Sequence, residues 1–89
     1  MRYLIVLEPA GSGFAVQVPD LAVITYGKTV EDAKYAAADA VRDNLEAYRE
    51  TGMPVPERQP VQNHLENPDF ADLLFAFIWV SESETSIAA

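Results

Sequence analysis

Two junction segments, Val18-Pro19-Asp20-Leu21 and Tyr26-Gly27-Lys28-Thr29-Val30-Glu31-Asp32-Ala33, separate a strand-rich beginning of the chain from a long alanine-rich stretch. The Pro-Asp pair of the first segment and the glycine of the second are typical of turns. Thr29 can accept a hydrogen bond from a free backbone amide in the first turn of a helix that begins at Val30. The two junctions therefore predict a strand, a turn, a further short strand and then a helix.

Two strand-like segments precede the first junction, and a third lies between the two. Tyr3–Glu8 carries apolar residues on both faces, which is typical of a strand that is covered on both sides. Residues 9–13 contain two glycines and suit a hairpin loop, and Phe14–Val18 alternates between apolar and smaller or polar residues. Leu21–Tyr26 is the third predicted strand. Because the connections are short, neighbouring strands are expected to be antiparallel.

The predicted helix covers Val30–Thr51. Acidic residues in its first turn complement the helix dipole, and Gly52 followed by Pro54 is a typical helix stop. A stripe at helical spacing predicts the face that packs on the sheet: Ala33, Ala37, Ala40, Val41, Asn44, Leu45 and Tyr48. A helix of this length extends about 33 Å, which exceeds the expected width of the sheet, so its C-terminal end is expected to project or to meet a partner.

The C-terminal third combines a proline-rich segment with an aromatic strand. Residues 54–70 contain four prolines and are predicted to be mostly irregular, and Leu73–Val80 is predicted to be the last strand, with Phe75, Phe77 and Trp79 on one face. A single helix covers one face of a sheet, so these aromatic residues would form a large apolar patch in a monomer. One alternative is a homo-oligomer, dimer or tetramer, with these residues at its interface. The other is that the proline-rich segment folds over them.

These elements predict an α+β fold: a small, mostly antiparallel sheet in the order β-β-β-α-β with one long helix on one face. Residues 1–81 are predicted to form one domain and residues 82–89 a flexible acidic tail. The chain has 89 residues and no cysteine, which excludes disulfides and thiolate metal sites. The longest apolar run is too short for a membrane-spanning helix, and no signal peptide is visible. We therefore expect a cytoplasmic protein without membrane association.

The negative charge is unevenly distributed. The net charge is −8, residues 1–29 are neutral, and the excess of acids lies in residues 30–51 and 57–89. Such a field repels nucleic acid and attracts basic proteins. The alternative is that the charge serves solubility alone.

Residues with catalytic chemistry are sparse. His64 is the single histidine, and Glu66 and Asp69 lie close to it in the sequence, so a metal or general-base site can be imagined. The segment has no second histidine and no cysteine, which favours a solvated loop histidine. Gly11-Ser12-Gly13 is not followed by a helix and is interpreted as a hairpin loop rather than a phosphate-binding loop. We predict a protein that is not an enzyme and that has no metal or cofactor.

Tyr3-Leu4-Ile5-Val6-Leu7-Glu8-Pro9, the two junction segments and Met53-Pro54-Val55-Pro56 together resemble the HicB family, the antitoxin half of HicA/HicB toxin–antitoxin pairs. The resemblance covers the first two-thirds of the chain and weakens after Pro56. It implies a truncated ribonuclease H fold. The active fold needs a metal-binding carboxylate in the middle of the first strand, where this chain has Leu4-Ile5-Val6.

The chain departs from the family pattern in two ways. Ala22-Val23 stands where the family commonly has a Pro-Gly pair, which predicts a longer third strand. Many family members carry a C-terminal DNA-binding domain, whereas 33 residues follow Pro56 and the last strand uses several of them. We therefore expect no direct binding of nucleic acid.

The resemblance implies that the protein binds and neutralises a small HicA-type toxin, an RNA-cleaving protein with a double-stranded-RNA-binding-like fold. Occlusion would be the mechanism: an acidic surface meets the basic RNA-binding surface of the toxin. That surface could be the C-terminal third or one helix face that carries four acids at spacings of four, three and four, namely Asp39, Asp43, Glu46 and Glu50. Two alternatives remain open, an orphan homo-oligomer with a regulatory or scaffolding role and an enzyme or ligand-binding protein that uses His64.

Overall fold

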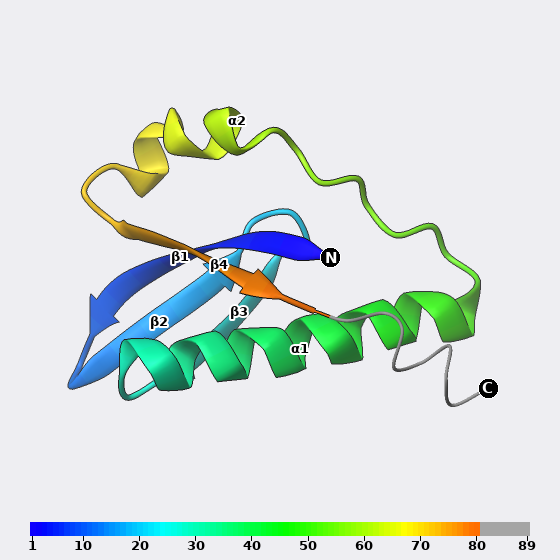
Figure 1. The fold of residues 1–89 in the computed structure, drawn as a ribbon, viewed down its shortest axis with the longest axis horizontal. Helices are drawn as coiled ribbons and strands as arrows, with labels where there is room; N and C mark the ends of the chain where they lie inside the picture. Colours follow the sequence, from blue (N-terminus) through cyan, green and yellow to red (C-terminus); the bar gives the residue numbers. More distant parts are fainter. Residues whose placement is uncertain (81–89) are drawn as a thin grey trace.

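The computed structural model describes residues 1–80, so the predicted acidic tail, residues 82–89, lies outside the described residues. Figure 1 shows a sheet with one long helix across one face. The strand order is β3-β2-β1-β4, and each pair of neighbours is antiparallel. The predicted α+β class is confirmed. The elements are β1 (Arg2–Ala10), β2 (Gly13–Val18), β3 (Val23–Gly27), α1 (Val30–Thr51), α2 (Val61–Leu65), the 3-10 turn η1 (Pro68–Phe70) and β4 (Leu74–Trp79).

The central position of β1 explains its apolar sequence. All residues from Tyr3 to Leu7 are buried. The residues Tyr3, Ile5 and Leu7 belong to the core beneath α1, whereas Leu4 and Val6 alternate with them and point to the opposite side, which we call the second face. The prediction of a strand covered on both sides is therefore confirmed.

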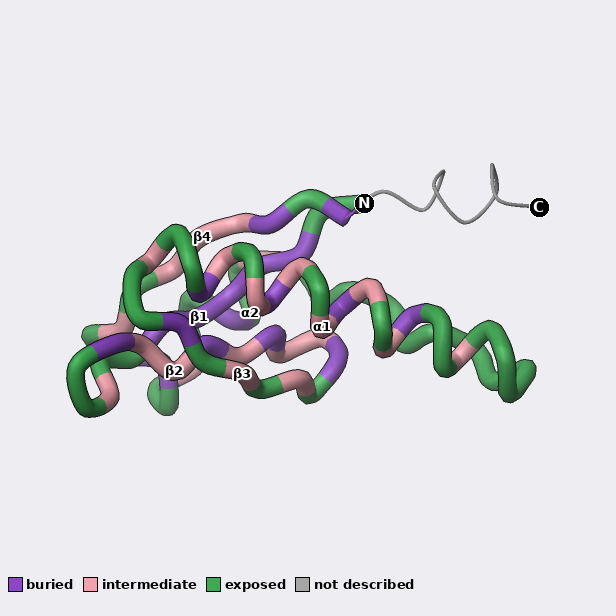
Figure 2. The backbone as a smooth tube through the Cα atoms, turned by 90° about the horizontal axis from the view of Figure 1, so that it is seen from below, coloured by how far each residue is buried: buried purple, intermediate pink, exposed green. Residues whose placement is uncertain are grey.

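Helix α1 packs on the sheet through small side chains. Ala33, Ala37, Val41 and Leu45 are buried, and the rest of the predicted stripe flanks them with partial exposure. Burial ends at Leu45, and the last turns of the helix extend beyond the sheet, as Figure 2 shows. Both the docking face and the projecting end are as predicted.

Both helix caps are as predicted. The Thr29 side chain accepts a hydrogen bond from the Asp32 amide at 3.0 Å. Gly52 has the left-handed conformation, with φ of 71°, and the Met53 amide donates to the Tyr48 carbonyl at 3.0 Å. These bonds satisfy backbone groups that the helix itself leaves free.

Gly27 has a different role from the predicted one. It ends β3 without a positive φ, so it is not a left-handed turn residue. A Cβ atom at this position would lie 2.2 Å from the backbone nitrogen of Ala33. Glycine is therefore needed because α1 begins directly against the end of β3.

The third strand is shorter than predicted. It begins at Val23 rather than at Leu21, because the turn after β2 continues through Ala22. The Leu21 amide donates to the Val18 carbonyl at 3.1 Å, and Ala22 has a positive φ of 55°. The longer third strand expected from Ala22-Val23 was therefore wrong, because Ala22 belongs to the turn and has the left-handed conformation.

Residues 53–73 form a segment that we call the strap. It leaves the end of α1, crosses to the second face and returns to β4 (Figure 1). The prediction of a mostly irregular segment was wrong for its second half, which contains α2 and η1. His64 and Phe70 of the strap are buried, and so are Leu4 and Val6 on the second face. Of the two predicted alternatives, the structure therefore shows the one in which the proline-rich segment folds over the sheet.

Within residues 1–80, no helix is long and apolar enough to cross a membrane.

Candidate functional site

The four acids predicted to bind a partner all lie on the exposed side of α1. Asp39, Asp43, Glu46 and Glu50 are exposed, and their helical spacing places them on one face. The Arg42 guanidinium donates to the Asp39 carboxylate at 2.9 Å. This acidic face is thus a solvent-exposed surface opposite the docking stripe.

The three aromatic residues predicted at an oligomer interface lie together on the second face of β4. Phe75 and Phe77 are half-buried, and Trp79 is 72% exposed. Phe70 of the strap contacts Phe75 edge-on, with ring centroids 6.4 Å apart. The Arg2 guanidinium lies 4.1 Å from the Phe77 ring centroid. The expectation of a wholly open aromatic face was therefore wrong, and Trp79 is the part of the set that remains open.

His64 is buried, so the interpretation as a solvated loop histidine was wrong. Its Nε2 atom lies 2.8 Å from Oδ1 of Asp20, which comes from the turn between β2 and β3. The His64 and Asp20 side chains are only 8% and 3% exposed. The same Asp20 oxygen accepts a hydrogen bond from the backbone amide of Gln59 at 3.0 Å. Asp20 therefore fastens the strap to the sheet, and we call these three residues the latch.

No group of three or more histidine, cysteine, aspartate or glutamate side chains within residues 1–80 could hold a metal ion. Glu66 and Asp69, which the sequence places near the histidine, are both exposed. The chemistry of the latch is that of a buried hydrogen bond that holds two segments together.

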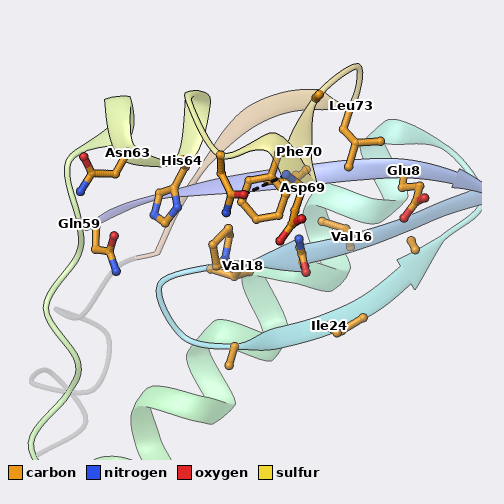
Figure 3. A pocket seen from close by; sticks show the side chains of 17 residues that line it. Glu8, Val16, Val18, Ile24, Gln59, Asn63, His64, Asp69, Phe70 and Leu73 are labelled. Carbon is orange, nitrogen blue, oxygen red and sulfur yellow. Dashed lines mark hydrogen bonds between the residues drawn. The ribbon is translucent and has the colours of Figure 1, made fainter.

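A groove of about 870 Å³ lies between the second face and the strap. We call it the sheet–strap groove. Figure 3 shows Asp69 and Phe70 reaching from η1 toward β2, with Ile24 of β3 at the open side. Among the described lining residues, the carboxylates are Glu8 and Asp69, and there is no lysine or arginine. The groove therefore has a mixed polar and apolar lining with negative charge, and Ile24 is its exposed large apolar side chain.

Sequence reasoning missed this groove. The sequence contains one signal for it. Side chains alternate between the two faces along the third strand, and this alternation places Ile24 and Tyr26 on the face opposite the helix. Ile24 is 73% exposed and Tyr26 is 47% exposed. Their exposure could not be predicted because it depends on β3 being an edge strand and on the strap leaving it uncovered.

The family model described as a HicB-like antitoxin of a bacterial toxin–antitoxin system matches residues 3–88. This chain belongs to the HicB-like antitoxin family. The match extends well beyond Pro56, so the expectation that the resemblance weakens there was wrong. No curated protein matches the chain.

Solved HicB antitoxins share the fold of this HicB-like chain. The crystal structure of antitoxin HicB from Burkholderia pseudomallei is 26% identical, with a TM-score of 0.83 over 94% of this chain. The match covers 66% of that relative, so this chain spans about two thirds of its length. The N-terminal domain of the same antitoxin is 25% identical, with a TM-score of 0.78, and is covered to 99%. A chain from the HicA3 and HicB3 toxin–antitoxin complex has a TM-score of 0.78 at 22% identity, covers 91% of this chain and is itself covered to 99%, which shows a shared fold.

Proposed function

We propose that this HicB-like domain binds and neutralises a small, basic, RNA-cleaving toxin of the HicA type by covering its RNA-binding surface. The observation that carries the proposal is the family match over residues 3–88. Further support comes from the shared fold with a chain whose solved structure is a HicA3 and HicB3 complex.

The charge of the domain fits this role. With a net charge of −8, the domain repels RNA and attracts a protein that is built to hold RNA. Two acidic surfaces are available, the exposed face of α1 with Asp39, Asp43, Glu46 and Glu50, and the acids of the C-terminal third. Of the latter, Asp69 lies with Glu8 at the sheet–strap groove. Complementary charge speeds association, and buried apolar contacts supply much of the affinity.

The proposed action is binding rather than catalysis. The middle of β1, where the active ribonuclease H fold needs a carboxylate, carries Leu4, Ile5 and Val6, and all three are buried. We also propose that the domain works in the cytoplasm, where its target acts, and that it does not bind nucleic acid directly. A self-associated form, a dimer or tetramer, completes the proposal, with the exposed Trp79 as its point of contact.

The test uses the gene next to the one that encodes this chain. If that gene encodes a short basic protein, the purified domain should bind it, more weakly as salt rises, and should restore growth of cells arrested by it. Failure of the unaltered domain to bind this protein would contradict the proposal and would favour an orphan homo-oligomer.

A further inference from the structure

The edge strand β3 lacks the features that usually prevent an edge strand from pairing with another chain. It is an edge of the sheet formed by residues 1–80, and its sequence Val23–Gly27 contains no charge and no proline. Edge strands offer unpaired backbone groups, and proteins normally blunt them with lysine, proline, bulges or a covering segment. Ile24 and Tyr26 add exposed apolar side chains to the second face of this edge. This combination is typical of a strand that accepts a partner strand.

The charge beside β3 indicates what kind of partner fits. The groove next to Ile24 carries the exposed carboxylates of Glu8 and Asp69. A second copy of this chain would bring the same uncompensated carboxylates to this groove, and this local repulsion opposes self-association at this site. A partner with lysine or arginine beside an apolar side chain would complement both the negative charge of the groove and the exposed apolar side chains of β3.

We propose that β3 and the sheet–strap groove form the contact surface for a basic protein, which adds an extended segment to the free edge of β3. An apolar side chain of that protein packs on Ile24, and its cations lie against Glu8 and Asp69. This inference rests on the proposed function, because the basic protein is the toxin, and it assigns the contact to one of the two acidic surfaces.

The two acidic surfaces then act at different stages of binding. The face of α1 with Asp43 and Glu50 is an exposed, charged helix surface, so we assign it to the diffusional encounter. The segment that we propose for the edge of β3 would bury Ile24 together with the Glu8 and Asp69 carboxylates, so the groove acts on the lifetime of the complex. Exposed rim charges change mainly the association rate, whereas buried contacts change mainly the dissociation rate.

Two matched pairs of variants separate these effects. Glu8→Lys with Asp69→Lys and Asp43→Lys with Glu50→Lys both reverse two charges, so each raises the net charge from −8 to −4. Ile24→Ser is matched with Tyr35→Ser, because both side chains are highly exposed, at 73% and 69%. Circular dichroism confirms the fold of each variant. Binding kinetics are measured against the neighbouring basic protein at two salt concentrations.

We expect both groove variants to raise the dissociation rate about tenfold, while the α1 pair lowers the association rate a few-fold and Tyr35→Ser has no effect. In addition, hydrogen exchange of the amides in β3 should slow in the complex of the unaltered proteins. Normal dissociation of the groove variants, or unprotected β3 amides in a complex that does form, would overturn the inference and leave the proposed function standing. Failure of the unaltered domain to bind would overturn the proposed function itself.

Discussion

Gly27 sets how closely the sheet and the helix can approach. A methyl group at this position would run into the backbone of Ala33 at the start of α1, and backbone atoms cannot rotate away as a flexible side chain can. We predict that Gly27→Ala lowers the free energy of unfolding by about 1–3 kcal/mol or more, as overpacking does. Urea denaturation measures this change.

The matched control is Gly11→Ala. Gly11 has a φ of +59° but open space around it, so its cost is backbone strain of about 1–2 kcal/mol, which the lower entropy of the unfolded chain reduces to about 0.5–1 kcal/mol. Equal stability of the Gly27→Ala variant and the unaltered protein would show that α1 does not rest against this position.

At Ala22 we expect a substitution to raise the free energy of unfolding. Its φ of 55° is a conformation that glycine adopts without a steric penalty, whereas alanine pays about 1–2 kcal/mol. After the entropic cost of glycine is subtracted, we expect Ala22→Gly to stabilise the protein by about 0.5–1 kcal/mol. Thermal unfolding measures the change, with Ala47→Gly on α1 as a destabilising control. A loss of stability at position 22 would contradict the left-handed turn.

At the scale of elements, the strap depends on the latch. Asp20 accepts hydrogen bonds from Gln59 and pairs with His64, and its side chain is almost fully buried. Arg58 adds one more anchor, since its guanidinium donates to the Arg2 carbonyl at 3.0 Å. Removing a buried acceptor leaves its donors unsatisfied, which costs about 1–3 kcal/mol.

We therefore predict that Asp20→Ala loosens the strap while the rest of the fold persists. Hydrogen exchange should become faster in residues 59–66 and stay unchanged in the middle of α1. Asp20→Asn keeps a side-chain oxygen that can accept a hydrogen bond, so it should have a smaller effect. Equal exchange in Asp20→Ala and the unaltered protein would mean that the strap is held by other contacts.

The elements differ in how far local sequence determines them. The caps at Thr29 and Gly52 were predicted because capping depends on residues three or four positions away. The central place of β1 followed from its two apolar faces. The burial of His64 could not be predicted, because its partner Asp20 lies 44 residues away and only the path of the strap brings them together.

In the whole molecule, the exposed side chain of Trp79 is a candidate contact for self-association. Trp79 is 72% exposed on the second face of β4, an edge strand at the opposite side of the sheet from β3. We predict that the protein forms a dimer or tetramer at micromolar concentration. The variant Trp79→Glu should lower the mass of the assembly without unfolding the chain. Size-exclusion chromatography with light scattering tests this. A monomeric mass for the unaltered protein would contradict an oligomer interface at the aromatic residues.

Only part of the candidate site can be predicted from the sequence. The acids of α1 were placed on one exposed face because helical spacing alone decides it. The sheet–strap groove was not predicted, because Glu8, Ile24 and Asp69 come from three elements that meet only in the folded chain. A site assembled from distant segments leaves no local pattern in the sequence.

The proposed action of this domain is to silence a toxin by covering it. The most direct measurement is RNA cleavage by the neighbouring basic protein, with the purified domain added in increasing amounts. We predict that cleavage stops near one domain per toxin and returns as rising salt weakens the complex. Undiminished RNA cleavage in the presence of excess domain would contradict this proposed action.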